Sequence, residues 1–160
     1  MKLTKITPFL WFNDNAEEAI NYYLEVFPGS KITQVTHYAD NMPLPKGTVL
    51  TMGFELSGNE FTALNGGPAL EFNEAVSFVV HCDGQDEIDY YWDKLLDGGS
   101  SMACGWLKDR FGLAWQIVPV KFFDMINSDD AKAAARVLAA MQQMIKFDIA
   151  ALEAAYNATS

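Results

Sequence analysis

The sequence predicts an α+β fold made of two consecutive βαβββ modules, over residues 1–68 and 69–120, followed by a helical tail over residues 121–160. An internal repeat is the first observation behind this prediction, because the segment Ile6–Ser30 resembles the segment Val76–Ser100. The second observation is that each copy contains one amphipathic helix pattern followed by three strand-like segments. We expect the modules and the tail to form one structural domain, since 160 residues is an ordinary length for one.

A short apolar run opens each copy of the repeat, Ile6–Phe12 in the first and Val76–Cys82 in the second. Runs of this length that end at a polar turn are typical of strands. The polar turns follow at once, at 13–15 and 83–85. Both runs are therefore expected to be strands that lead directly into a helix.

The two helix patterns share a common core, Ile20–Tyr23 in the first copy and Ile88–Tyr91 in the second. Any of the three residues at 13–15 can cap the first helix, and the acidic residues of the next turn suit its positive end. Gly29 and the pair Gly98-Gly99 follow the two helices, as expected for the left-handed residue that ends many helices.

Three strand patterns follow each helix pattern and complete the modules. They cover 31–38, 48–56 and 60–65 in the first copy, and 101–103, 105–108 and 113–118 in the second. Short turns at 57–59 and 109–112 are expected to join the last two strands of each copy as hairpins.

The tail has helical rather than strand periodicity. A helical turn is expected over 122–126, a helix over 131–144 capped by a residue of 128–130, and a second helix from Asp148 to Tyr156. Its apolar stripe is expected to comprise Val137, Met141, Met144 and Ile145, then Ile149, Leu152 and Tyr156. Such a stripe is more often packing than a cofactor site, and it can pack on its own chain or on a partner.

Composition and charge exclude several classes of function. The net charge is −10, from 21 acidic and 11 basic residues, which disfavours nucleic acid and anionic membrane surfaces as partners. The two cysteines, Cys82 and Cys104, are too few for a disulfide scaffold. No apolar run approaches the ~20 residues of a membrane span and no signal-peptide pattern is seen, so we expect a cytoplasmic protein.

Several motifs, taken in order, resemble one known family. They are Ile6–Phe12, Glu17–Tyr23, Phe27–Ser30, Ala63–Pro68, Asp109–Gly112 and Trp115–Val118. The chain resembles the vicinal oxygen chelate superfamily, which includes glyoxalase I, extradiol dioxygenases and bleomycin- and fosfomycin-resistance proteins, and most closely its PhnB-like branch, labelled 3-demethylubiquinone-9 3-methyltransferase-like. The resemblance implies that each module curls into a half-barrel, that the two halves form a small-molecule cup with helices outside, and that the protein is a homodimer.

The resemblance also implies where a metal would be held, because metal-dependent members place His, Glu or Gln ligands on the first and last strands of each module. These positions fall on Thr7 and Ser77, which lie 70 residues apart, and on Gln116. The fourth position falls near Ala63, with Asn65 as the nearest polar side chain. Divalent ions prefer carboxylate, imidazole or thiolate ligands, so we expect neither a catalytic metal nor another cofactor.

Side chains that share a strand face are expected to line the cup. The predicted ligand-binding residues are Thr7, Phe9, Trp11, Asn65, Ser77, Val79, His81, Trp106 and Gln116. This aromatic and neutral-polar set suits a planar or apolar small molecule, although the same side chains could instead fill a closed barrel. Tyr38, Lys108 and Asp109 can reach the mouth of the cup. His81 is the candidate for a catalytic general base, against the more ordinary interpretation of a structural or surface histidine.

A metal-independent small-molecule-binding protein, comparable to the resistance proteins, is the first hypothesis. The alternative is an enzyme of the superfamily: a lyase, isomerase or dioxygenase acting on a small organic substrate, or an acid–base catalyst that uses His81, Asp109 or Gln116. Methyl transfer rests on the family label alone, because no glycine-rich methyl-donor motif follows a strand. A third hypothesis is an interaction module whose amphipathic tail binds a partner chain.

Overall fold

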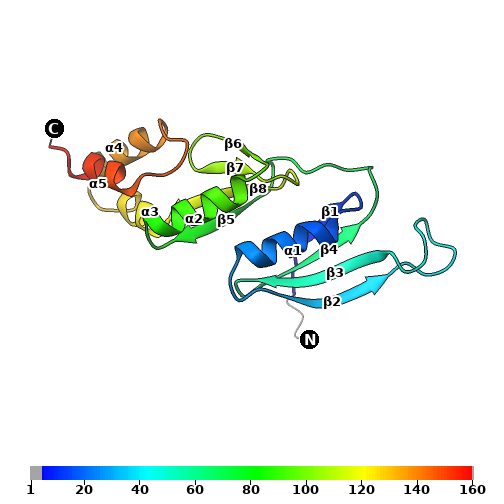
Figure 1. The fold of residues 1–160 in the computed structure, drawn as a ribbon. Coiled ribbons are helices and arrows are strands. Elements are labelled where there is room, and N and C mark those ends of the chain that lie inside the picture. Colours follow the sequence, from blue (N-terminus) through cyan, green and yellow to red (C-terminus); the bar gives the residue numbers. More distant parts are fainter. Residues whose placement is uncertain (1–4, 160) are drawn as a thin grey trace. The chain divides into compact units, whose positions relative to one another are not determined.

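The computed structural model describes residues 5–159 and divides into two compact units, Met1–Phe72 and Asn73–Ser160 (Figure 1). The first unit contains one βαβββ module, and the second contains another such module together with the helices of the tail. Each unit has its own sheet, and a helix of the same unit covers one face of that sheet.

The first unit is a four-stranded mixed sheet with one helix. In chain order its elements are β1 (Phe9–Phe12), α1 (Ala16–Val26), β2 (Lys31–His37), β3 (Val49–Leu56) and β4 (Asn59–Asn65). The strand order is β1-β4-β3-β2, with β1 parallel to β4 and the other neighbours antiparallel. The predicted βαβββ order is confirmed in this half of the chain.

The second unit repeats this topology. Its module consists of β5 (Ser77–Cys82), α2 (Gln85–Leu96), β6 (Ser100–Ser101), β7 (Trp106–Lys108) and β8 (Ala114–Pro119). The order β5-β8-β7-β6 is the order of the first sheet element for element, and β5 again runs parallel to β8. The predicted α+β class and the tandem repeat are therefore confirmed.

Alternation along the strands explains which sheet face meets the helix. In α1 the apolar positions at helical spacing are buried, namely Ala16, Ala19, Ile20, Tyr23 and Val26. On β3 every second residue, Met52, Phe54 and Leu56, is buried as well. The second unit follows the same rule, because Ile88 and Leu95 of α2 are completely buried. One helix and one alternating sheet face thus form the core of each module.

The first helix is capped from a distant strand rather than by its own turn. Asn15 occupies the N-cap position, but its side chain makes no capping hydrogen bond. Instead, the side-chain Oδ1 of Asn65, at the end of β4, accepts a hydrogen bond of 2.9 Å from the backbone N–H of Ala16. The prediction that a residue of 13–15 caps this helix is therefore wrong.

The tail forms three helices, α3 (Val120–Ile126), α4 (Ala131–Met141) and α5 (Ile149–Asn157). The predicted caps of the last two are confirmed, since Asp130 accepts from the N–H groups of Lys132 and Ala133, and Asp148 accepts from that of Ala151. The described residues include no helix long and apolar enough to cross a membrane.

The helix predicted to reach Met144 ends at Met141 instead. The reason is a long-range pairing: Cys104 N–H donates to Met144 O at 2.8 Å, and Gly105 N–H donates to Ile145 O at 2.7 Å. The chain leaves the helix through a turn at 142–143 and a bend at 145–146. Ile145 was predicted to join the apolar stripe, but its side chain is exposed.

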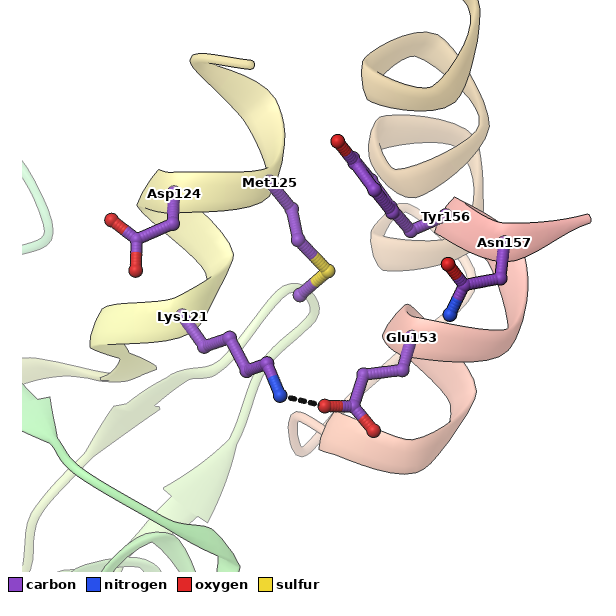
Figure 2. A pocket seen from close by; sticks show the side chains of 6 residues that line it. All are labelled: Lys121, Asp124, Met125, Glu153, Tyr156 and Asn157. Atoms are coloured by element: carbon purple, nitrogen blue, oxygen red, sulfur yellow. Dashed lines mark hydrogen bonds and ion pairs between the residues drawn. The ribbon is translucent and has the colours of Figure 1, made fainter. Parts of the chain in front are cut away.

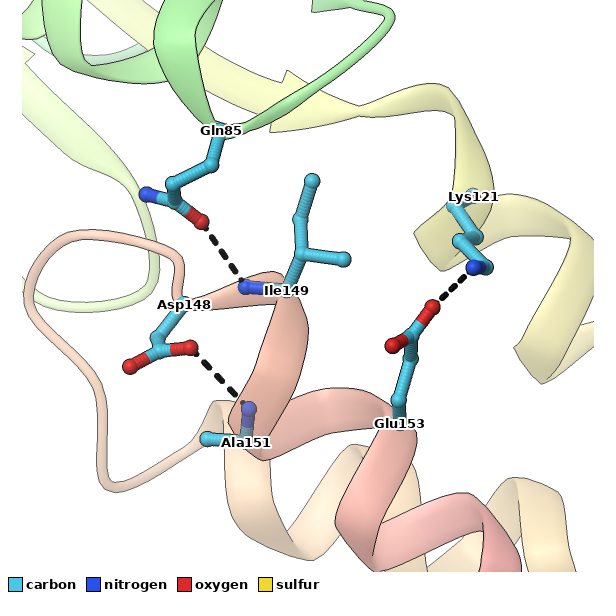
Figure 3. A network of polar contacts seen from close by, with 6 residues as sticks. All are labelled: Gln85, Lys121, Asp148, Ile149, Ala151 and Glu153. Carbon is cyan, nitrogen blue, oxygen red and sulfur yellow. Dashed lines mark hydrogen bonds and ion pairs between the residues drawn. The ribbon is translucent and has the colours of Figure 1, made fainter.

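The tail is attached to the second module through Gln85, at the start of α2 (Figure 3). Its side-chain Nε2 donates to Phe147 O at 3.0 Å, and its Oε1 accepts from Ile149 N–H at 3.0 Å. The Phe147 ring is buried against Gly105, where any Cβ would overlap the ring. Of the two predicted surfaces for the tail, its own chain or a partner, the structure shows packing on its own chain.

Candidate functional site

Each sheet has a second face that its helix does not cover, and the predicted ligand-binding residues can be placed relative to it. On the first sheet this face carries Phe9 and Trp11 of β1. Phe9 is 59% exposed and Trp11 is half-buried, whereas Leu10 and Phe12 face the helix and are buried. We call this the open face of the first sheet.

Two cross-strand rows that include residues of β1 lie on the open face of the first sheet, and a further row on this face carries the charged residues Lys31, Glu55 and Glu60. The register places Phe9, Thr62, Gly53 and Gln34 in one row, and Trp11, Leu64, Thr51 and Thr36 in the next. The hydroxyls of Thr36 and Thr51 lie 2.6 Å apart and are hydrogen-bonded. Both rows contain only apolar and neutral polar side chains. Thr7 lies two residues before β1 and is half-buried.

Trp11 is held in one orientation by the glycines at 66–67. Its indole N–H donates to Gly67 O at 2.9 Å, and its ring covers Gly66 so closely that a Cβ there would overlap it. In the structure these glycines provide the surface on which the indole ring rests, so Trp11 offers a ring face and not its N–H to a ligand.

Asn65 lies on the helix-covered face of β4 and is 1% exposed. Besides capping α1, its side-chain amide donates to Val49 O at 3.1 Å. Its own backbone oxygen accepts from the hydroxyl of Tyr38 at 2.7 Å, and Tyr38 is buried rather than placed at a mouth. The side chains of both residues therefore stabilise the first module, and we do not include them in the site proposed below.

The register also identifies the fourth of the metal-ligand positions, the one on the last strand of the first module, which the sequence placed only near Ala63. Phe9 pairs with Thr62, and its repeat counterpart Val79 pairs with Gln116. Thr62 is thus the equivalent of Gln116, and the sequence estimate near Ala63 is corrected by one residue. This shift matters because neighbouring strand residues point to opposite faces of the sheet.

The second sheet has an equivalent open face, on the side opposite α2. It carries Ser77, Val79 and His81 of β5, Ala114, Gln116 and Val118 of β8, and Trp106 and Lys108 of β7, of which Ala114 and Val118 are buried. Val79, Gln116 and Trp106 form one cross-strand row across three strands. Val79 is 41% exposed, and the other two are half-buried.

A hydrogen bond of 2.9 Å from Gln116 Nε2 to Ser77 Oγ orients the Gln116 amide. Within residues 5–159 this is the one hydrogen bond made by the Gln116 side chain, so its Oε1 and second N–H have no protein partner. The indole N–H of Trp106 likewise has no partner among these residues. The cross-strand row therefore combines apolar surface with unused hydrogen-bonding groups.

His81 is exposed on this open face, and its ring centroid lies 5.6 Å from that of Phe123 in α3. In the described part of the chain no carboxylate hydrogen-bonds to the imidazole. A general base is normally oriented by such a partner. The structure thus leaves the general-base role of His81 a prediction and adds no support to it.

Asp109 is 3% exposed and braces the β7–β8 hairpin. Its Oδ1 accepts from the N–H groups of Phe111 and Leu113, at 2.8 and 3.1 Å, and its Oδ2 accepts from the indole of Trp115 at 2.8 Å. The interpretation of Asp109 as an acid–base group at the mouth is replaced by this structural role. Lys108 forms an ion pair with Glu74, and the hydrogen bond from Lys108 lowers the pKa of Glu74 below its ordinary value.

A hollow of about 440 Å³ lies elsewhere in the second unit, between α3 and α5 (Figure 2). Its lining residues are Lys121, Asp124, Met125, Glu153, Tyr156 and Asn157. An ion pair between Lys121 and Glu153 spans it and joins the two helices. None of the predicted ligand-binding residues lines this hollow, and sequence patterns had marked Tyr156 as packing only.

Comparison with known proteins supports the family resemblance that the sequence motifs indicated. The family model described as 3-demethylubiquinone-9 3-methyltransferase matches residues 4–118. The chain belongs to this family. The PhnB protein of Bacillus cereus is 34% identical over 73% of this chain and 100% of that chain, with a TM-score of 0.67. None of the curated proteins matches the sequence.

Two further solved structures share the fold of this family. A Pseudomonas aeruginosa protein is 23% identical over 73% of this chain and 98% of that one, with a TM-score of 0.60. The fosfomycin resistance protein FosX of Listeria monocytogenes, in complex with Mn(II) and sulfate, is 13% identical over 73% and 92% of the chains, with a TM-score of 0.53. The predicted membership of the vicinal oxygen chelate superfamily is confirmed.

The superfamily implies a divalent metal, but the side chains at the equivalent positions do not fit one. With the register corrected, these positions hold Thr7, Thr62, Ser77 and Gln116. All four are neutral, and the Gln116 amide is already hydrogen-bonded to Ser77. Hard divalent ions prefer sites rich in carboxylate oxygens, and softer ions prefer imidazole or thiolate, so one neutral amide and three hydroxyls make a poor ligand set. Residues 5–159 also contain no group of three His, Cys, Asp or Glu that could hold a metal ion.

Proposed function

We propose that this protein binds a small, neutral, partly aromatic organic molecule on the open faces of its sheets. The observation that supports the proposal is the chemistry of these faces: exposed apolar side chains, such as Phe9 and Val79, lie in rows with neutral hydroxyl and amide groups. Binding sites for small organic molecules combine mainly apolar surface with a few polar groups that fix orientation. Because no charged residue occupies these rows, a neutral ligand matches them best.

Methyl transfer is not part of the proposal, although the family's description mentions it. A glycine-rich binding motif for such a donor would be a loop directly after a strand, where glycines let the backbone approach the ligand closely. Here β1 and β5 are followed by Asn13-Asp14-Asn15 and Asp83-Gly84-Gln85, and both segments lead directly into helices. The small-molecule-binding role is supported by the residues themselves, whereas the methyl-transfer role is supported by a name.

The test is a thermal-shift and calorimetric screen of neutral one- and two-ring aromatic compounds against the native protein. The variants Phe9→Ser and Val79→Ser reduce the apolar surface of one open face each. Loss of roughly 60 Å² of apolar contact corresponds to about 1.5 kcal/mol, or about a tenfold weaker Kd. Leu138→Ser is the matched control, because Leu138 is 40% exposed on α4 and belongs to neither sheet.

We expect at least one compound to stabilise the native protein and the Leu138→Ser control equally, with weaker binding to one or both face variants. The proposal is contradicted if no compound in the screen binds. It is equally contradicted if every compound that binds does so with the same Kd to all three variants.

A further inference from the structure

We propose that Gln116, Ser77 and Trp106 recognise a cyclic amide, that is, a planar ring carrying adjacent C=O and N–H groups, as in a lactam or imide. This inference rests on the proposed function and specifies the ligand class at the open face of the second sheet. It begins from the disagreement described above, in which a hydrogen-bonded hydroxyl and amide stand where the superfamily implies metal ligands.

The Ser77 hydroxyl determines how the Gln116 amide is presented. One N–H of Gln116 is used by Ser77 Oγ at 2.9 Å, which limits rotation of the amide plane. The carbonyl oxygen and the second N–H remain, and they are an acceptor and a donor in one plane. A cyclic amide carries, on one edge, a donor for the Gln116 carbonyl oxygen and an acceptor for its remaining N–H.

The neighbours of Gln116 in its row favour a planar ring. Gln116 is paired with Trp106 of β7 on one side and with Val79 of β5 on the other, so its amide is flanked by an indole ring and an exposed aliphatic side chain. The indole N–H of Trp106 has no partner in the described chain, whereas those of Trp11 and Trp115 donate to Gly67 O and to Asp109. Trp106 therefore offers both a stacking surface and one more donor for a ligand carbonyl.

The charges around this row disfavour an ionic ligand head group. Lys108, on the same face of the adjacent β7–β8 pair, is occupied by its ion pair with Glu74. A carboxylate ligand would place its charge against the Gln116 carbonyl oxygen without a free cation to balance it. An ammonium ligand would find one acceptor and two opposing donors. A neutral group with one donor and one acceptor can hydrogen-bond to both the carbonyl oxygen and the remaining N–H of Gln116.

The test uses three probes of nearly equal shape: 2-quinolinone, N-methyl-2-quinolinone and quinoline. 2-Quinolinone has the full amide edge, its N-methyl derivative has lost the donor, and quinoline lacks the carbonyl. Calorimetry gives the Kd of each for the native protein. Side-chain ¹⁵N–¹H spectra report directly on the Gln116 amide and the Trp106 indole.

We expect 2-quinolinone to bind at least tenfold more tightly than the other two probes, because an unmatched donor or acceptor in a hydrogen-bonding site is strongly disfavoured. We also expect it to shift the Gln116 and Trp106 signals. Gln116→Met keeps the length of the side chain and should reduce this preference to less than threefold. Gln143→Ala is the control, since Gln143 is exposed after α4, and it should preserve the preference.

Failure of the inference can be distinguished from failure of the proposed function. If the three probes bind alike, or Gln116→Met retains the preference, or other aromatic compounds bind while 2-quinolinone does not, cyclic amide recognition is refuted and the proposed function stands. If neither these probes nor any compound of the aromatic screen binds, both are refuted. Thermal unfolding of Gln116→Met confirms that the variant is folded, and Ser77→Ala provides a second, smaller perturbation of the same amide.

Discussion

Asn65 and Asp109 are the buried polar residues of the described chain, and both were assigned from the sequence to a ligand cup or its mouth. Each instead satisfies backbone or indole N–H groups around it. A polar side chain on a strand can point to either face of the sheet, and a shift of one residue in register exchanges the two faces. The sequence could identify that these residues matter, but their facing depends on long-range pairing that the local pattern does not contain.

Cys82 is a buried thiol whose ionisation is suppressed. Its side chain is completely buried, and this burial, with smaller contributions from the negative charges of Glu87 and Asp83, raises its pKa to about 12. The thiolate is the reactive form of cysteine. We therefore expect Cys82 to react with 5,5′-dithiobis(2-nitrobenzoate) at pH 8 at least about a hundredfold more slowly in the folded than in the urea-unfolded protein. Equal rates would contradict this.

The same burial predicts how stability changes with pH. An unfolded thiol loses its proton near pH 8.5, whereas folded Cys82 keeps its proton up to about pH 12. The folded state thus binds more protons over this window, and the free energy of unfolding must fall as the pH rises through it. Urea titrations from pH 7 to 10 should show a shallower fall for Cys82→Ala than for the native protein. Cys104→Ser, the matched control, should retain the native slope.

At the level of elements, the repeat and the helical periodicity predicted every helix and strand of the two modules, with differences at their ends. The β-strands were identifiable because apolar runs and turns alternate at regular spacing. The pairing of 104–105 with 144–145 was not predictable, since these segments share no sequence pattern and are joined by backbone hydrogen bonds alone. The packing of the Phe147 ring against Gly105 was not predictable from the sequence either.

Gln85 connects α2 to the tail by two hydrogen bonds, and its substitution should lower the stability of the protein. Gln85→Ala leaves Phe147 O without its partner, and also Ile149 N–H, whose bond to Gln85 is drawn in Figure 3, in a half-buried setting. We expect a loss of about 1–3 kcal/mol in the free energy of unfolding, together with faster amide exchange at Ile149. Urea unfolding and hydrogen exchange measure the two effects. Gln143→Ala should change neither, and a stability loss of the same size in that control would argue against a specific role for Gln85.

At the level of the whole molecule, the two units share one topology but are completed differently. The first sheet ends in the buried amide of Asn65, which caps its own helix. The second ends in Pro119 and continues into α3, so three further helices pack on that unit. The repeat explains the shared part. Pro119 occupies the position equivalent to Asn65 and has no side-chain amide, so it cannot cap α2 as Asn65 caps α1. Sequence comparison of the two copies therefore predicts their sheets but not the role of the tail.

Deletion of residues 128–160 distinguishes a structural tail from an interaction module. The deletion removes Phe147, whose ring centroid lies 5.1 Å from that of Phe122, and leaves Cys104 and Gly105 N–H groups without their acceptors. We expect amide exchange in β5–β8 to accelerate at least about tenfold, because opening of this sheet becomes easier, while β1–β4 keep their protection.

Deletion of only 158–160, which follow α5, is the matched control and should leave exchange in both sheets unchanged. An interaction module would behave in the opposite way. Its removal would preserve the protection of β5–β8 and alter the molar mass measured by light scattering. Unchanged exchange in β5–β8 after the longer deletion would thus refute the structural role, because the segment between α4 and α5 supplies backbone acceptors and the Phe147 ring to residues 104–105, and its removal must lower the local stability of this module.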